Sequence, residues 1–295
     1  MNTFNDTRNK DSFNEDSQPG NGKGFGSRYM AEWRLEMFSL GNTYDDNDID
    51  LVKTFKPDPK IAYGVVKFGI LIWVAYTIVY AFLNTIDRRI WIGFLTHWVA
   101  IINFLYFLGS FLLLVTVPIS QDEGVNKWTR MTWILYPVSL NLGLIASILF
   151  WALVYEPPLA YETVMLHGIF FMLVLFDGMI LNRIPIRLKH LLWTELVSFV
   201  YLLWTLIHGL SPLGNPNLNC EDNPDTDDDA LYDTLNWKKR PVPALILVFF
   251  VMGVAVPIVH HLLWFVSIFF QPRHYIAPKK VEKEHEVEAE EELDF

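Results

Sequence analysis

Three ionisable side chains interrupt a stretch of the sequence, residues 158–181, that is otherwise apolar. They are Glu162, His167 and Asp177. If this stretch crosses a bilayer, an ionisable side chain that faces lipid at its centre costs roughly 2.5–3.5 kcal/mol. These side chains are therefore expected to face a protein interior or a wet cavity. In such a cavity a neutral histidine can act as a general base.

A threonine on a neighbouring apolar stretch is the candidate nucleophile for this base. Thr96, Asn103 and Ser110 are spaced by seven residues, so they share one face of a helix. At about 1.5 Å per residue, and with the orientation argued below, Thr96 and His167 lie roughly 8 and roughly 14 Å below the same membrane surface. A neutral imidazole within about 3 Å can take the proton of a threonine hydroxyl, which makes its oxygen a nucleophile for acyl transfer.

Other polar side chains are candidates for supporting roles. Asn103, or a hydroxyl on the fifth apolar stretch, can donate to an oxyanion. His208 is a possible third member of the pair or a lid residue. The alternative interpretation is helix packing, because small and hydroxyl side chains serve at helix interfaces in membranes. Packing is favoured for Ser110, Thr194 and Ser198, whereas the three ionisable groups leave open both a structural network and a working cavity.

Long apolar helices must position these residues. Of the 295 residues, 52% are hydrophobic and 19% are charged, below the roughly 25% of charged residues in soluble domains. Six stretches reach the about 20 residues that cross a bilayer, namely 61–83, 91–119, 129–155, 158–181, 188–210 and 242–270. The expected fold is an all-α integral membrane protein with six transmembrane helices in one bundle, contained in residues 61–270.

Polar regions surround this bundle. Residues 1–60 form a polar, partly disordered N-terminal region, in which 28–40 are expected to lie on the membrane surface or to dock on the protein. The tail, 271–295, is charged, and the loop 211–241 is acidic. With a cytosolic N-terminus, twelve Lys and Arg residues flank the inner ends of the spans and five the outer ends. The positive-inside rule then predicts that both termini are cytosolic.

Composition excludes several other classes of function. The net charge of −10 argues against nucleic acid binding, which needs a basic face. Cys220 is the single cysteine, so neither an intrachain disulfide nor a cysteine metal cluster is expected. The acidic loop lacks the regular spacing and central glycine of a calcium-binding EF-hand loop. No metal and no organic cofactor is expected.

Several segments resemble one family of membrane proteins. FLTHW at 94–98 resembles the L-T-x-W segment of the rolling stone family. The stretch 167–190, HGIFFMLVLFDGMILNRIPIRLKH, resembles that family's histidine, aspartate and basic-turn pattern. LYDTLNWKKRP at 231–241 is similar to the segment before the family's final span. The resemblance extends from about residue 60 to about residue 270.

This resemblance implies a reaction for the pair. Rolling stone proteins look distantly related to the androgen-induced protein family. Members of that family are intramembrane hydrolases with six spans, and they cleave fatty acid esters of hydroxy fatty acids. The relationship implies a nucleophile at Thr96 and a base at His167, with the acidic residue Asp177 ten positions later. Phe170 stands where the resemblance implies a polar side chain.

Two hypotheses of different classes follow. In the first, the protein hydrolyses fatty acyl ester lipids in an intramembrane polar pocket by a Thr96–His167 pair, in the plasma membrane or the endoplasmic reticulum. Its partners are then the bilayer and an acyl lipid, and the sequence specifies no protein partner. In the alternative, it is a non-enzymatic protein of cell–cell fusion or adhesion, with the acidic loop 211–241 as contact surface. A transporter is disfavoured because no inverted repeat is visible.

Overall fold

The computed structural model describes residues 59–116, 127–155, 157–211 and 230–270, together with residues 29, 30, 33, 213 and 215. Every regular element in this part of the chain is helical, so the all-α prediction is confirmed there. Nearly all of the N-terminal region 1–60, the acidic run 216–229 and the tail 271–295 lie outside the described residues. The predictions for those regions, including the adhesive role of the acidic loop, stay predictions.

Six helices are long and apolar enough to cross a membrane, which is compatible with a multi-pass membrane protein. Several are continued or interrupted by π turns. In chain order they are α3 (Lys60–Asn84); α4 (Leu95–Thr116); α5 (Lys127–Leu149) with η3 (Phe150–Val154); α6 (Tyr161–Val164), η4 (Met165–Ile169), α7 (Phe170–Leu175) and η5 (Phe176–Leu181); η6 (Leu188–His190) with α8 (Leu191–Leu210); and α9 (Pro241–Phe250), η9 (Val251–Ala255) and α10 (Val256–Phe270).

The second span begins later than the sequence predicts. A short 3-10 helix, η2 (Arg88–Gly93), occupies the predicted first turn of that span. Asp87 caps η2, because its carboxylate accepts a hydrogen bond from the Arg89 backbone amide at 3.0 Å. The same carboxylate pairs with the Arg89 guanidinium at 2.8 Å, and hydrogen bonding with this side chain lowers the pKa of Asp87. The backbone at Phe94 is extended, with φ −81° and ψ 140°. Thr96 therefore lies in the first turn of a new helix.

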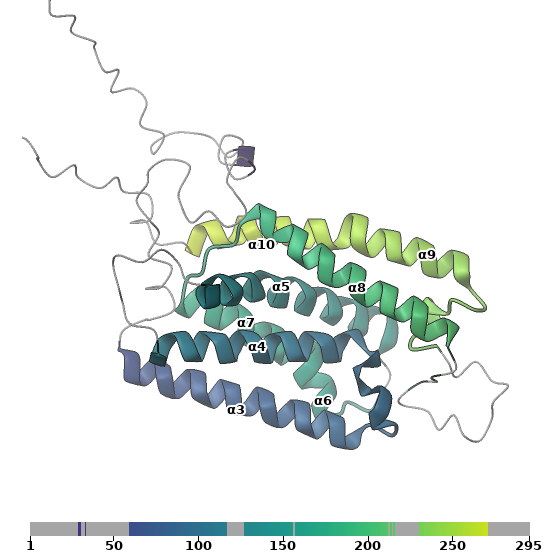
Figure 1. The fold of residues 1–295 in the computed structure, drawn as a ribbon, viewed down its shortest axis with the longest axis horizontal. Helices are drawn as coiled ribbons and strands as arrows, with labels where there is room; N and C mark the ends of the chain where they lie inside the picture. The colour runs from purple at the N-terminus through teal and green to yellow at the C-terminus, as the bar shows by residue number, and fades with distance from the viewer. Residues whose placement is uncertain are drawn as a thin grey trace, which may run out of the picture.

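The helices run alternately up and down (Figure 1). We call the end of the bundle where α3 begins and α10 ends the proximal end, and the end that holds η2 the distal end. Helix α5 is central, because it packs against α4, α7, α8 and α10. Helix α3 lies against α4 and also meets α6. The site residues of different spans are thus arranged around α5.

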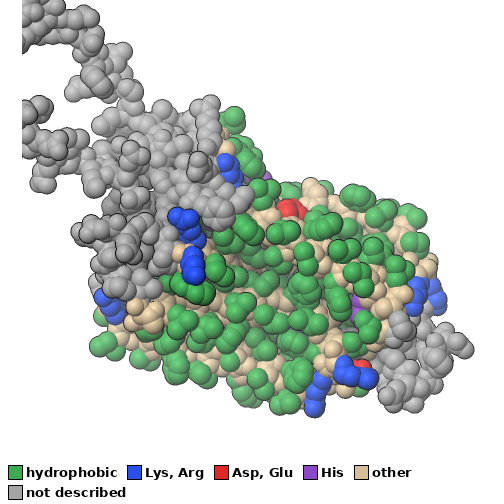
Figure 2. Space-filling model, viewed as in Figure 1, with side chains coloured by type: hydrophobic (Ala, Val, Ile, Leu, Met, Phe, Trp, Pro, Cys, Tyr) green, Lys and Arg blue, Asp and Glu red, His purple; other side chains and the backbone are tan. Residues whose placement is uncertain are grey.

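The burial pattern is the one expected of a protein surrounded by lipid. Large apolar side chains face outward along the helices, as with Ile61 at 85% and Phe269 at 72% exposure. Figure 2 shows hydrophobic side chains over most of the visible face, with Lys and Arg toward the two ends. Meanwhile Lys67, Asn103 and Asp177 are buried inside the bundle. Polar groups avoid the outer surface because lipid offers them no hydrogen bonds.

The basic turn between the fourth and fifth spans folds into the bundle. Ile184, Ile186 and Arg187 are buried, whereas the sequence predicts Arg187 among the charges that flank the membrane. The indole of Trp133 donates to the Pro185 carbonyl at 2.6 Å, and His260 of α10 contacts the Arg187 carbonyl at 3.0 Å. These bonds close the proximal end of the bundle.

Tyr29 shows how the N-terminal region meets the bundle. Its hydroxyl lies 3.2 Å from Nε2 of His261, and its ring packs edge-on against Trp264 with centroids 5.8 Å apart. This contact joins Tyr29 to α10, whereas most of residues 28–40 lie outside the described residues, so both interpretations of that segment stay predictions.

Gly178 is required by a close helix contact, which gives a first testable prediction. A Cβ at position 178 would lie 1.9 Å from an atom of the Tyr136 ring. Gly178→Ala is therefore expected to destabilise the protein by about 1–3 kcal/mol, because overpacking forces neighbouring groups apart. The measurement is the thermal unfolding midpoint in detergent. Gly253→Ala is the matched control, since a Cβ there meets nothing within 4 Å; similar midpoints for both variants would contradict the contact.

Candidate functional site

His167 lies in the π turn η4, a type of turn that is frequent at functional sites. Its imidazole stacks on Phe150 of η3, with centroids 3.4 Å and planes 7° apart. Its backbone oxygen accepts a 2.8 Å hydrogen bond from the Trp151 indole. The side chain is 9% exposed, and Nδ1 has no hydrogen-bond partner among the described residues. Stacking, rather than a carboxylate, therefore sets the orientation of this ring.

Thr96 is buried in the first turn of α4. The Leu95 amide donates to the Tyr232 hydroxyl at 3.2 Å, and the two amides after Thr96 donate to the Phe94 carbonyl. The Thr96 amide takes part in none of these bonds. Amides in a first turn have no acceptor within their helix, and they carry the positive end of its dipole. The Thr96 amide is thus placed to donate to a developing oxyanion.

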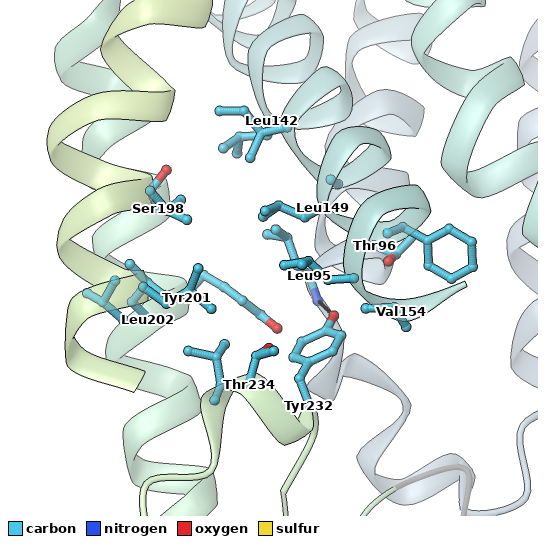
Figure 3. A pocket seen from close by; sticks show the side chains of 18 of the residues that line it. Leu95, Thr96, Leu142, Leu149, Val154, Ser198, Tyr201, Leu202, Tyr232 and Thr234 are labelled. Atoms are coloured by element: carbon cyan, nitrogen blue, oxygen red, sulfur yellow. Dashed lines mark hydrogen bonds between the residues drawn. The ribbon is translucent and has the colours of Figure 1, made fainter. Parts of the chain in front are cut away.

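Thr96 and His167 both line two cavities at the distal end. The apolar slot has a volume of about 90 Å³ and is lined mainly by aliphatic side chains, most of them from α5, η3 and the α9–η9–α10 span (Figure 3). The polar cavity has a volume of about 590 Å³ and is lined by the end of α3, by α6 and by the 230–234 segment. Seven residues line both cavities: Thr96, Phe150, Leu153, Val154, His167, Tyr232 and Thr234. The Thr–His pair therefore stands where an apolar and a polar space meet.

Tyr232, from the segment before α9, adds a hydroxyl to this boundary. Figure 3 shows the side chains of Tyr201 and Tyr232 directed toward one another. Tyr201 donates to the Gly93 carbonyl at 3.2 Å. Burial raises the pKa of Tyr232, and hydrogen bonding with Tyr201, Leu95 and Thr96 opposes part of that rise. The phenol of Tyr232 therefore stays protonated near neutral pH and can donate a hydrogen bond beside Thr96.

The structure shows no direct hydrogen bond between Thr96 and His167; their side chains share the walls of the same two cavities. Catalytic hydrogen bonds are often long or poorly aligned in unliganded enzymes and shorten when substrate binds. Within the described residues, no three His, Cys, Asp or Glu side chains are grouped to hold a metal ion.

The four predicted supporting residues lie in different places. Glu162 lines the polar cavity. Asn103 is buried and accepts a hydrogen bond from Ser139, but it lines neither cavity. His208 is also fully buried and lines neither cavity. This arrangement favours the Thr96 amide over Asn103 as the oxyanion donor.

Asp177, the fourth supporting residue, belongs to a separate cluster near the proximal end. Nζ of Lys67 lies 3.1 Å from its Oδ1. Its Oδ2 accepts hydrogen bonds from the Tyr106 hydroxyl at 2.6 Å and the Asn182 amide at 2.9 Å. Ser110 bonds to Lys67 and lies 3.4 Å from the same Oδ2. Lys67 and Asp177 are 1% and 0% exposed, so this cluster is a closed ion pair away from His167.

Sequence reasoning missed three residues that matter here. Lys67 is the single cation within the predicted span 61–83. An ionisable residue inside a membrane span is costly, so its presence alone could have marked Lys67 as a residue with a buried partner. His97 follows Thr96 directly, stacks on Trp91 with centroids 4.1 Å apart and lines the polar cavity. Tyr232 gave no signal beyond its place in the segment before the final span, because only the folded chain brings it to Thr96.

Comparisons with known proteins add no relative to this picture. No protein-family model matches the chain, and no curated protein or solved structure is significantly similar to it. The functional argument therefore rests on the geometry of the two cavities.

The buried ion pair provides a second prediction. Lys67→Met leaves the Asp177 carboxylate buried without a cation, and removal of one partner of a buried pair costs about 3–5 kcal/mol. We expect a marked fall in the unfolding midpoint in detergent, and a smaller fall when Asp177→Asn is added to the same protein. Lys60→Met, at the exposed start of the same helix, is the control. A Lys67→Met protein as stable as this control would rule out the pairing as a source of stability.

Proposed function

We propose that this protein is an intramembrane hydrolase of fatty acyl ester lipids, with Thr96 as nucleophile and His167 as general base, as the rolling stone resemblance implies. The observation that carries the proposal is the position of both side chains on the boundary between the apolar slot and the polar cavity. An ester lipid has the same division, because its acyl chain is apolar while its ester and headgroup are polar. Such a lipid would place its carbonyl at this boundary.

In the proposed acylation step, His167 accepts the proton of the Thr96 hydroxyl as Oγ1 attacks the ester carbonyl carbon. The carbonyl oxygen becomes an oxyanion, which the Thr96 amide and the Tyr232 hydroxyl can stabilise by hydrogen bonds. The tetrahedral intermediate then collapses. The C–O bond to the alcohol breaks, the alcohol oxygen takes the proton from the His167 imidazolium, and an acyl ester remains on Thr96.

In the second step, water enters from the polar cavity. His167 accepts one of its protons while the water oxygen attacks the acyl carbon. Collapse of this intermediate breaks the bond to Oγ1, and the imidazolium returns the proton to Thr96. The fatty acid is released and both residues are restored to their starting states.

The imidazolium has an unusual environment in this proposal. In serine hydrolases a carboxylate orients the histidine and stabilises its positive charge. Here Asp177 is bonded to Lys67, and the ring instead stacks on Phe150. An aromatic face attracts a cation through its negative quadrupole. Phe150 is thus the group that supports the charge that His167 acquires.

Thr96 gives the decisive test of this function. Purified protein in detergent is reacted with a fluorophosphonate probe and assayed on a fluorogenic acyl ester. Thr96→Ala should abolish labelling and reduce hydrolysis by about 10³-fold or more, whereas Thr96→Ser should keep both, because the hydroxyl is retained. Thr163→Ala is the matched control, since that threonine lines the same polar cavity. Full activity and labelling in Thr96→Ala would sink the proposal.

His167 gives an independent test. His167→Gln keeps a polar side chain but removes the base, so kcat should fall by about 10²–10⁴-fold. The fall should be similar in kcat and in kcat/KM, because the lost interaction acts on the transition state. A variant that changes KM alone would show that His167 binds substrate and does not transfer a proton.

A further inference from the structure

Among the described residues, the polar cavity is lined by carboxylates and by no lysine or arginine. Among the described residues that line it, the charged side chains are Glu162 and Asp233. Glu162 is half-buried in the first turn of α6, and no Lys or Arg of the described chain forms an ion pair with it. The cavity therefore contains carboxylate charge that a bound group can neutralise.

The arginines at the distal end do not cancel this charge inside the cavity. Arg89 pairs with Asp87 at 2.8 Å, and Arg88 donates to the Leu83 carbonyl at 2.8 Å. Neither lines the polar cavity, and neither do Lys238, Lys239 and Arg240, which precede α9. An anionic group in the cavity would meet like charge without a compensating cation.

Aromatic rings form another part of the wall. Phe94, Phe150 and Tyr232 all line the polar cavity. Aromatic faces combined with carboxylates are the surroundings that bind quaternary ammonium groups. In addition, His167 is nine-tenths buried in this wall, with its Nδ1 unpartnered among the described residues. The site thus has a reactive group beside a surface suited to a cation.

We propose that the polar cavity selects acyl esters with a cationic, choline-like headgroup, and that Glu162 is the residue that determines this specificity. The proposal rests on the proposed function for the position of the ester, and it adds the chemical class of the alcohol. The apolar slot, of about 90 Å³, takes the part of the acyl chain next to the ester, and the quaternary ammonium group lies in the polar cavity near Glu162. Esters that carry a free carboxylate at this position, including those of hydroxy fatty acids, bind weakly.

Binding of non-hydrolysable analogues tests this selection without any turnover. The hexadecyl ethers of choline, glycerol and glycolate share one alkyl chain and carry cationic, neutral and anionic headgroups. Each competes with a radiolabelled choline ether for the purified protein in a maltoside detergent at low salt. We expect the choline ether to bind about tenfold or more tightly than the glycolate ether, with the glycerol ether between them.

Variants of Glu162 assign the effect to one residue. Glu162→Gln should lower the ratio between the affinities for the choline and glycolate ethers several-fold, because Asp233 and the aromatic rings remain, and Glu162→Lys should reverse it. Glu195→Gln is the matched control, because this glutamate lies on α8 and lines neither cavity. It should keep the wild-type ratio. Unfolding midpoints of all three variants verify that each protein is folded when it is assayed.

The outcomes separate this inference from the proposed function. A glycolate ether that binds as tightly as the choline ether overturns the inference, even if hydrolysis depends on Thr96. A wild-type ratio in a folded Glu162→Gln protein overturns the role of Glu162. Selective binding of the choline ether without any Thr96-dependent hydrolysis supports the inference and overturns only the hydrolase.

Discussion

The lack of hydrogen-bonding solvent around the helices is the constraint on which this structure depends. In lipid, backbone groups are satisfied within helices, and polar side chains have to find partners inside the bundle. In the described chain, polar side chains gather inside the bundle in two clusters, one near each end. Lys67 and Asp177 pair near the proximal end, and Thr96 and His167 lie near the distal end beside the two cavities. Large apolar side chains cover the surface between the ends (Figure 2).

The two clusters differ in how completely their polar groups are used. Both oxygens of Asp177 lie within ion-pair or hydrogen-bond distance of neighbours, and the ion pair is closed to solvent. Such a network holds three spans together and offers no room for a ligand. Nδ1 of His167 has no hydrogen-bond partner among the described residues, and the walls around this ring enclose free volume. Because Asp177 pairs with Lys67, it does not orient His167, and the His167 ring stacks on Phe150 instead.

Local departures from regular α-helix build the distal site. His167 and its stacking partner Phe150 both lie in π turns, η4 and η3. A third π turn, η9, contributes Val251 to the apolar slot. A π turn contains an extra residue, so it changes the direction of side chains relative to a continuous α-helix. The extended residue Phe94 has a comparable effect, because it starts α4 next to Thr96, whose amide takes part in none of the hydrogen bonds that the Leu95, His97 and Trp98 amides make.

The sequence by itself determined the six spans, since uninterrupted apolar runs of that length favour helices that cross a bilayer. It also marked Thr96, His167 and Glu162, because polar groups in such runs are costly and stand out. The tertiary structure decided the partners: Lys67 for Asp177, Tyr232 beside Thr96, and Phe150 under His167. It also decided the burial of the 182–188 turn, in which Arg183 alone is exposed. Those contacts join segments far apart in the chain. Hydrophobic periodicity shows which face of a helix is buried but not which helix covers it, so only the packed bundle could reveal them.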